Sequence, residues 1–203
     1  MIHTSLSFLQ TALNHFIFVK DPLNTAGVLD HAVMLDTIVN QENKPIHTNG
    51  DYVIMTLVNL EEETVGKSQL PYFKTPDDKL HVLNPDLKIN LYIQFSAFSD
   101  NTLSSPPAYE RALILLDQVV FFFQYRNVFN GSQYPILFDA GIEKLIIEPI
   151  SLTFEQLNHL WATLGAKYLP SVIFKCKMLT FRETVVSPET IPIKELLTDD
   201  VLI

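Results

Sequence analysis

An acidic run, Glu61–Glu63, is the densest group of side chains in this 203-residue chain that could do chemistry. Paired carboxylates act as general acid and base in hydrolases, and carboxylate oxygens also bind cations. The run follows a stretch of β-forming residues, however, and neighbouring residues on a strand point to opposite faces of a sheet. It therefore predicts a solvated charge cluster. Asp139 and Glu143 flank Gly141 and suggest a metal loop, but the spacing lacks a third suitable ligand.

Nucleophiles and metal-binding pairs are equally sparse. Cys176 is the one cysteine, which excludes a disulfide within the chain and a cysteine-based zinc site. It lies among alternating apolar residues, where a free cysteine acts as a small hydrophobic side chain; a nucleophile is the alternative. No G-x-S-x-G, G-x-x-x-x-G-K-[ST] or G-x-G-x-x-G motif is present, and no H-x-x-H or H-E-x-x-H pair occurs among the histidines, which are His3, His15, His31, His47, His81 and His159. We therefore expect no enzyme, with no catalytic, metal or cofactor site.

The composition predicts a globular chain with one core. Apolar residues make up 47% and charged residues 18%, which is typical of a folded domain with apolar surface patches. The net charge of −9 excludes an electrostatic nucleic-acid binder, because phosphate neutralisation needs clustered lysine and arginine. The longest apolar run, residues 112–123, is too short to span a membrane, and residues 1–18 lack a secretory signal pattern. We expect one domain over residues 1–183, folded in the cytoplasm, and a tail or arm over residues 184–203.

The first half of the chain predicts one helix followed by strands. Leucines at helical spacing predict a helix over residues 5–19. β-Forming residues predict strands over 32–39 and 52–60, the second apolar enough to be buried on both faces. Residues 64–85 show no regular pattern. Residues 87–98 then alternate strictly, which predicts an antiparallel strand with Leu87, Ile89, Leu91, Ile93 and Phe95 on the core and Lys88, Asn90, Tyr92, Gln94 and Ser96 facing solvent.

The second half predicts a long helix over residues 107–125 and a strand over 144–149. The core stripe of the helix is predicted at Leu113, Leu116, Val119, Val120 and Phe123, and Leu115 and Phe122 widen it. So much apolar circumference indicates packing on two sides or against a neighbouring subunit. The expected fold class is α+β, a mixed or antiparallel twisted sheet with about three helices packed on it.

The region 153–182 carries the most specific pattern. A capping box, Thr153–Gln156, starts a short helix, and Gly165 fits the left-handed position after its end. The strand that follows alternates, with Lys175 and Lys177 opposite its apolar face. The predicted buried stripe of the helix consists of Phe154, Leu157, Leu160, Trp161 and Leu164.

This region resembles the L-x-x-L-W-x-x-L-G-x-x-Y-x-P-S signature of tail-terminator (cap) proteins in extracellular contractile injection systems, the phage-tail-like particles. The matching residues are Leu157, Leu160, Trp161, Leu164, Gly165, Tyr168, Pro170 and Ser171. Three more segments are similar to the family in the same order: 58–61 to a V-N-x-E strand end, 91–95 to an L-N-L-Y strand, and 109–123 to a helix with Y-x-x-A-L and a Phe-rich end. The segment from Thr184 onward lies outside the resemblance.

The resemblance implies a phage tail-terminator-like fold and a structural role. Such proteins form a hexameric ring on the baseplate-distal end of the tube and sheath, end polymerisation and join tube to sheath. The implied partners are further copies of this chain and the sheath and inner-tube proteins, with no cofactor, nucleic acid or membrane span, in a particle assembled in the cytoplasm that can be released. The alternatives are an assembly chaperone or adaptor of the same kind of particle, and a small hydrolase, which would need a cleft that the sequence does not predict.

Two segments are candidates for the contacts of such a ring. Residues 184–203 finish on three large apolar residues, which we expect to dock on the domain or on a partner. Residues 64–85 are the second candidate, because a long irregular segment is commonly functional. Disordered surface is the alternative for both. The expected interface residues are Phe122, Lys175, Lys177, Ile193, Leu196, Leu197, Val201, Leu202 and Ile203.

Overall fold

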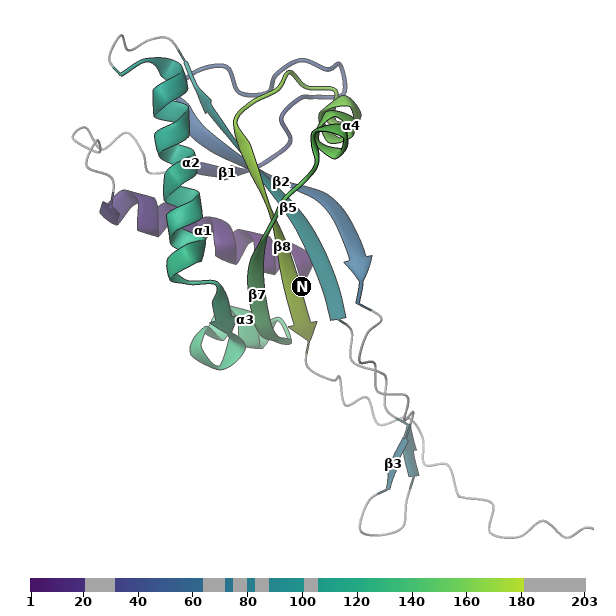
Figure 1. Ribbon diagram of the computed structural model, residues 1–203. Coiled ribbons are helices and arrows are strands. Elements are labelled where there is room, and N and C mark those ends of the chain that lie inside the picture. The colour runs from purple at the N-terminus through teal and green to yellow at the C-terminus, as the bar shows by residue number, and fades with distance from the viewer. Residues whose placement is uncertain (21–31, 64–71, 75–79, 83–87, 101–105, 181–203) are drawn as a thin grey trace, which may run out of the picture.

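The computed structural model describes residues 1–20, 32–63, 72–74, 80–82, 88–100 and 106–180. Its centre is a six-stranded sheet with the order β1-β2-β5-β8-β7-β6 (Figure 1). β1 runs parallel to β2 and the other neighbouring strands are antiparallel, so the expected α+β fold with a mixed sheet is confirmed. The strands are β1 Val33–Leu35, β2 Asp51–Glu62, β5 Lys88–Ser99, β6 Val128–Asn130, β7 Ile142–Ile150 and β8 Ser171–Thr180.

Helices cover both faces of the sheet in the described part of the chain. Three of them, α1, α2 and α3, pack on the face that carries the main core, and α4 lies on the other face (Figure 1). The sequence predicts all but α3, whose five residues are too few to show a helical period. None of these helices is both long and apolar enough to cross a lipid bilayer. The helices are α1 Ile2–Lys20, α2 Ala108–Tyr125, α3 Pro135–Asp139 and α4 Phe154–Leu164, with a 3₁₀ turn at Gly131–Gln133.

The main core lies between α1, α2 and one face of the central strands β5 and β8. In the register of this antiparallel pair, Leu91 lies opposite Cys176 and Ile93 opposite Phe174. All four side chains are buried in one apolar cluster. The alternation predicted for the core face of both strands is therefore confirmed.

The second face of β5 does not meet solvent as expected. Gln94 and Ser96 are buried, and Gln94 Nε2 donates a hydrogen bond to Ser96 Oγ at 3.0 Å. A second apolar cluster on this side of the sheet contains Tyr52 and Ile54 of β2 and Trp161 of α4. Because β5 has a strand on each side and a helix packs over this second face, polar residues at alternate positions are enclosed as well.

β1 forms one edge of the sheet, and side chains of α1 cover part of that edge. The Val33 N–H donates to Asn14 Oδ1 at 2.8 Å, and Asn14 Nδ2 donates to the Val33 carbonyl at 3.0 Å. Gln10 Nε2 donates to the same carbonyl at 3.1 Å. Asn14 therefore satisfies the backbone groups of Val33 that a further strand would otherwise pair.

β2 extends well beyond the residues that pair with β1. Among the described residues, strand pairing for residues 56–62 comes from β5 alone. β2 is buried on both faces over residues 52–56, as predicted, but Leu60 is exposed. Within the described residues, the second half of β2 is therefore an edge of the sheet, and its last residues are exposed.

α4 confirms its predicted capping and corrects its predicted buried stripe. Gln156 N–H donates to Thr153 Oγ1 at 3.2 Å, Thr153 N–H donates to Gln156 Oε1 at 3.0 Å, and Gly165 is left-handed with φ 65°. Phe154, expected on the buried stripe, is instead 93% exposed. Trp161 is the one buried residue of α4, and Leu157 and Leu164 pack against the same cluster. Phe154 lies in the first turn, beyond that contact.

The segment predicted to lack regular structure contains a small hairpin. β3 (Tyr72–Lys74) pairs antiparallel with β4 (Leu80–Val82) in a separate two-stranded sheet. In Figure 1 this hairpin lies beyond the ends of β2 and β5. Strands of three residues are too short to give a readable alternation, which is why the sequence did not predict them. The rest of residues 64–85 lies outside the described part of the chain.

Candidate interaction surfaces

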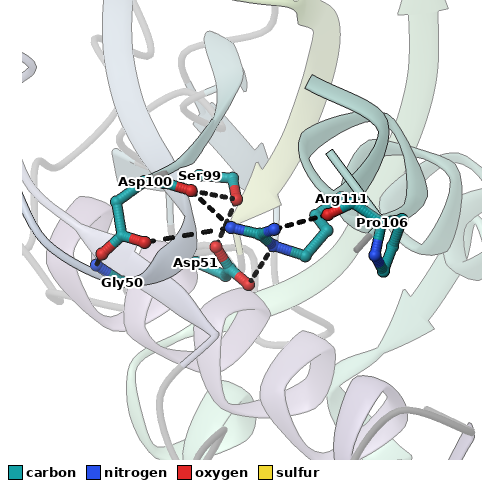
Figure 2. Close-up of polar contacts among 6 residues, drawn as sticks. All are labelled: Gly50, Asp51, Ser99, Asp100, Pro106 and Arg111. Carbon is teal, nitrogen blue, oxygen red and sulfur yellow. Dashed lines mark hydrogen bonds and ion pairs between the residues drawn. The ribbon is translucent and has the colours of Figure 1, made fainter. Parts of the chain in front are cut away.

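A buried charge cluster fixes the start of α2 to the sheet (Figure 2). Arg111, in the first turn of α2, is 4% exposed. Its Nε donates to Asp51 Oδ2 at 3.0 Å and its Nη1 donates to the Pro106 carbonyl at 2.6 Å. Its Nη2 donates to the Asp100 carbonyl and lies 3.8 Å from Asp100 Oδ1. The Ser99 hydroxyl donates to the other oxygen of Asp51. The charges of Arg111 and Asp51 are therefore both paired and hydrogen-bonded.

This cluster sets the rotation of α2 about its axis. Because Arg111 faces the sheet, Leu115 and Phe122, four and eleven residues further on, face it as well. The stripe predicted for this helix is confirmed at Val119 and Phe123 and in its widening to Leu115 and Phe122. It is wrong at Leu113 and Val120, which are exposed. The apolar side chains that the rotation leaves outside are the ones available to a partner.

An apolar groove runs between the last turns of α1 and α2. Its main part has a volume of about 840 Å³ and is lined by Phe16, Lys20, Gln118, Phe121, Gln124 and Tyr125. A smaller continuation of about 450 Å³ shares Phe16, Lys20 and Tyr125 with the main part and adds His15, Arg126 and Tyr134. Phe121 and Tyr125 are 57% and 80% exposed. Large aromatic side chains with this much exposure are typical of a surface that another protein segment covers.

The charge of this groove is opposite to that of the chain. Among the described residues that line its two parts, Lys20 and Arg126 carry positive charge, and none is acidic. The whole chain carries a net charge of −9. The groove therefore favours a partner segment that is both apolar and acidic.

Lys175 and Lys177 lie on the opposite face of the sheet from α2. Lys177 Nζ is 2.8 Å from Glu148 Oε2 on β7, and Lys175 Nζ lies 5.7 Å from the centre of the Tyr92 ring on β5. The Tyr92 hydroxyl donates to Glu61, and this hydrogen bond is the main reason that the Tyr92 pKa is raised. The structure thus places both predicted interface lysines together on a polar, partly exposed sheet face. Their role at an interface stays a prediction.

Phe122, also predicted at an interface, is not part of this face. Phe122 is 5% exposed and packs in the core of the chain, with its ring centre 5.2 Å from that of Phe16. The rotation set by Arg111 turns it inward, so its exposed neighbour Phe121 is the accessible aromatic residue. The apolar residues predicted in the last segment lie outside the described residues; they are Ile193, Leu196, Leu197, Val201, Leu202 and Ile203.

Among the residues singled out for chemistry, Cys176 lies in the main core and the acidic run lies at the end of β2. Cys176 is fully buried in the main core, as expected for a small hydrophobic side chain, and burial raises the pKa of its thiol to about 12. Within the described ranges, no group of three or more histidine, cysteine, aspartate or glutamate side chains could hold a metal ion. In the predicted solvated run, Glu61 and Glu62 are exposed and Glu63 accepts a hydrogen bond from Asn90 at 3.1 Å.

Because the Cys176 thiol is buried, we expect the free energy of unfolding to fall at alkaline pH. The folded chain holds the Cys176 proton to a higher pH than the unfolded chain does, since its pKa rises from 9.0 to about 12. Unfolding therefore releases a proton above about pH 9, and the free energy of unfolding falls by about 1.4 kcal/mol per pH unit up to about pH 12. We expect Cys176→Ala to lose about 2 kcal/mol less than the natural chain between about pH 8 and about pH 10.5, measured by urea unfolding.

The comparison between these two chains isolates the thiol. Burial, and then the nearby Asp100 charge, also raise the pKa of Tyr52 to about 12, but Tyr52 is present in both chains. Equal losses of stability in the two chains would show that the thiol does not titrate on unfolding in this range.

The chain matches a protein family, and the solved structures similar to it include two terminator proteins. The family described as the Pvc16 N-terminal domain matches residues 7–195. The sheath/tube terminator of PVC, an extracellular contractile injection system, in its extended state, superposes with a TM-score of 0.59 at 11% identity over 98% of this chain. The tube-terminating cap of the anti-feeding prophage superposes with a TM-score of 0.54 at 12% identity over 93% of this chain. No curated protein sequence matches the chain.

These solved chains are longer than this one. The chain spans 62% of the PVC terminator and 58% of the anti-feeding prophage cap. At identities of 11% and 12% the likeness is one of fold, and the fold is that of tail terminators.

Proposed function

The chain belongs to the Pvc16 N-terminal domain family, and from this membership we propose that it is a structural cap subunit, or tail terminator, of a contractile injection system. The cap is a homo-hexameric ring on the baseplate-distal end of the tube and sheath, where it ends polymerisation and joins the two. The observation that carries the proposal is the fold likeness to a sheath/tube terminator and a tube-terminating cap over nearly the whole chain. Its role is structural and not enzymatic.

The edges of the sheet support this role. A helical polymer exposes unpaired groups on its last layer, and such an edge is a template for further addition. A cap covers the edge by adding a strand or an arm of its own. The second half of β2, whose described strand partner is β5 alone, is the edge we assign to this contact.

Ring contacts are assigned to the exposed aromatic groove and to the predicted interface residues. The partners are neighbouring copies of the chain and the sheath and inner-tube proteins. Lys175 and Lys177 face one of these proteins from the polar side of the sheet, and the segment 184–203 and the hairpin segment 64–85 supply the arms. Assembly takes place in the cytoplasm, in a particle that can then leave the cell.

Mass in solution tests the ring. The full chain has a mass of 23.1 kDa, and we expect light scattering to give about six times this value, as closed cyclic symmetry permits. Removal of residues 184–203 is expected to lower the measured mass, because the segment belongs to the contact.

Electron microscopy of whole particles tests the position. Gold label on a tagged chain should mark the baseplate-distal end of each particle, and particles made without the chain should have tubes of uncontrolled length. If the chain is a strict monomer in solution and the label is absent from the particle ends, the cap proposal is overturned. The assembly chaperone or adaptor is then favoured.

A further inference from the structure

The groove between α1 and α2 has the features of a surface that binds a partner. It combines exposed aromatic side chains, Phe121 and Tyr125, with a basic residue at the end of α1, Lys20. Its continuation adds Arg126, whose Nη1 donates to the Tyr134 hydroxyl at 2.7 Å. A ligand that suits this groove has large apolar side chains next to carboxylates.

The segment 184–203 of this chain has that composition. It carries four acidic side chains and one lysine, and its last five residues place Asp199 and Asp200 directly before Val201, Leu202 and Ile203. We infer that the apolar and acidic segment 184–203 of one subunit binds in the α1–α2 groove of the neighbouring subunit. The apolar side chains then cover Phe121 and Tyr125, while the aspartates lie close to Lys20.

The length of the segment allows this contact. The described chain stops at Thr180, whose backbone pairs with Ile142 at the start of β7. The residues from Thr180 to Asp199 can extend over about 65 Å, at about 3.4 Å per residue. This is more than the diameter of a small domain, so the segment can reach the groove of an adjacent subunit.

The inference rests on the proposed ring for its choice of a neighbouring subunit. A groove on one copy that binds a segment of the next is a head-to-tail contact, and such contacts leave one groove and one segment unmatched unless the assembly closes. A ring matches every groove with a segment. The arrangement therefore gives the proposed hexamer a specific subunit contact.

Cysteine cross-linking in the full chain tests the contact. Gln124 lines the groove and is exposed, so the paired variant Gln124→Cys with Leu202→Cys leaves the core unchanged. The natural Cys176 is fully buried and its thiol pKa is raised, so it does not compete. Under oxidation we expect a ladder of covalent oligomers on a non-reducing gel. An equal mixture of the two single variants should give covalent dimers, because the two cysteines then lie on different chains.

A control cysteine pair and an exchange of charges between the groove and the segment test whether the cross-links are specific. Lys167→Cys with Leu202→Cys, which places the first thiol at an exposed position after α4, should give no ladder. Lys20→Glu should lower the yield of groove cross-links about twofold to fivefold, the range expected for an exposed ion pair. Asp199→Lys with Asp200→Lys in the same chain should restore that yield.

The outcomes separate this inference from the cap proposal. Cross-links confined to single chains, or absent while light scattering still shows a ring, would overturn the inference and leave the cap intact. A monomer that shows no cross-links and leaves particle ends unlabelled would overturn both. Equal ladders from the groove pair and from the Lys167 pair would show random collision and would also overturn the inference.

Discussion

Replacing Arg111 with methionine is expected to lower the free energy of unfolding by about 3–5 kcal/mol, because removal of one partner leaves buried charges uncompensated. The Arg111 guanidinium bonds to Asp51, to the Pro106 carbonyl and to Asp100 (Figure 2). Methionine keeps the apolar stem and removes every one of these hydrogen bonds. Urea unfolding followed by circular dichroism measures the loss.

Two further variants define the Arg111 effect. Arg126→Met removes an exposed arginine with one hydrogen bond, to Tyr134, and should cost less than about 1 kcal/mol. Arg111→Lys keeps the charge without the planar fork, and should lie between the natural chain and Arg111→Met. If Arg111→Met cost no more than Arg126→Met, the cluster would not be what fixes α2.

The paired variant Phe121→Asp with Tyr125→Asp is expected to convert the proposed ring to monomers. Buried aromatic residues at the centre of an interface contribute about 2 kcal/mol or more each, which corresponds to about 30-fold in affinity for each residue. Here the change also places carboxylates beside an acidic segment. Both side chains are exposed in the subunit, so the free energy of unfolding should change little. Light scattering at matched concentrations measures the mass.

Phe154→Asp provides the matched control for this pair. Phe154 is an exposed aromatic residue on the opposite face of the sheet, in α4, and the same substitution there should leave the ring intact. If Phe154→Asp lost the ring and the Phe121 and Tyr125 variant kept it, the subunit contact would be assigned to α4 and not to the groove. An intact ring in the Phe121 and Tyr125 variant would show that the groove takes no part in assembly.

The features that the sequence predicts correctly are those set by residues close together in the chain. The capping box of α4, the left-handed Gly165 and the alternation of β8 each depend on fewer than about a dozen consecutive residues. The mixed α+β fold followed from such local elements taken together with the resemblance around Trp161.

The features that the sequence does not predict depend on residues far apart. α2 is apolar on most of its circumference, so periodicity alone fits several rotations; the pairing of Arg111 with Asp51 and Asp100 selects one. A lone arginine in a helical stretch gives no sign of that choice. The second face of β5 is predicted to be polar because Gln94 and Ser96 alternate with apolar residues, yet both side chains are buried in a strand that has a neighbour on each side.

The two hydrogen bonds between Asn14 and Val33 limit where a further strand can pair with this edge of the sheet. An amide side chain imitates the backbone of an incoming strand there, so the β1 border is blunt, while the far half of β2 is left available for pairing among the described residues. Both stretches lie on the same edge of the sheet, so an added strand can pair with the far half of β2 but not with the backbone of Val33. In the proposed cap, this would confine pairing with the last layer of a polymer to one short stretch of the sheet edge.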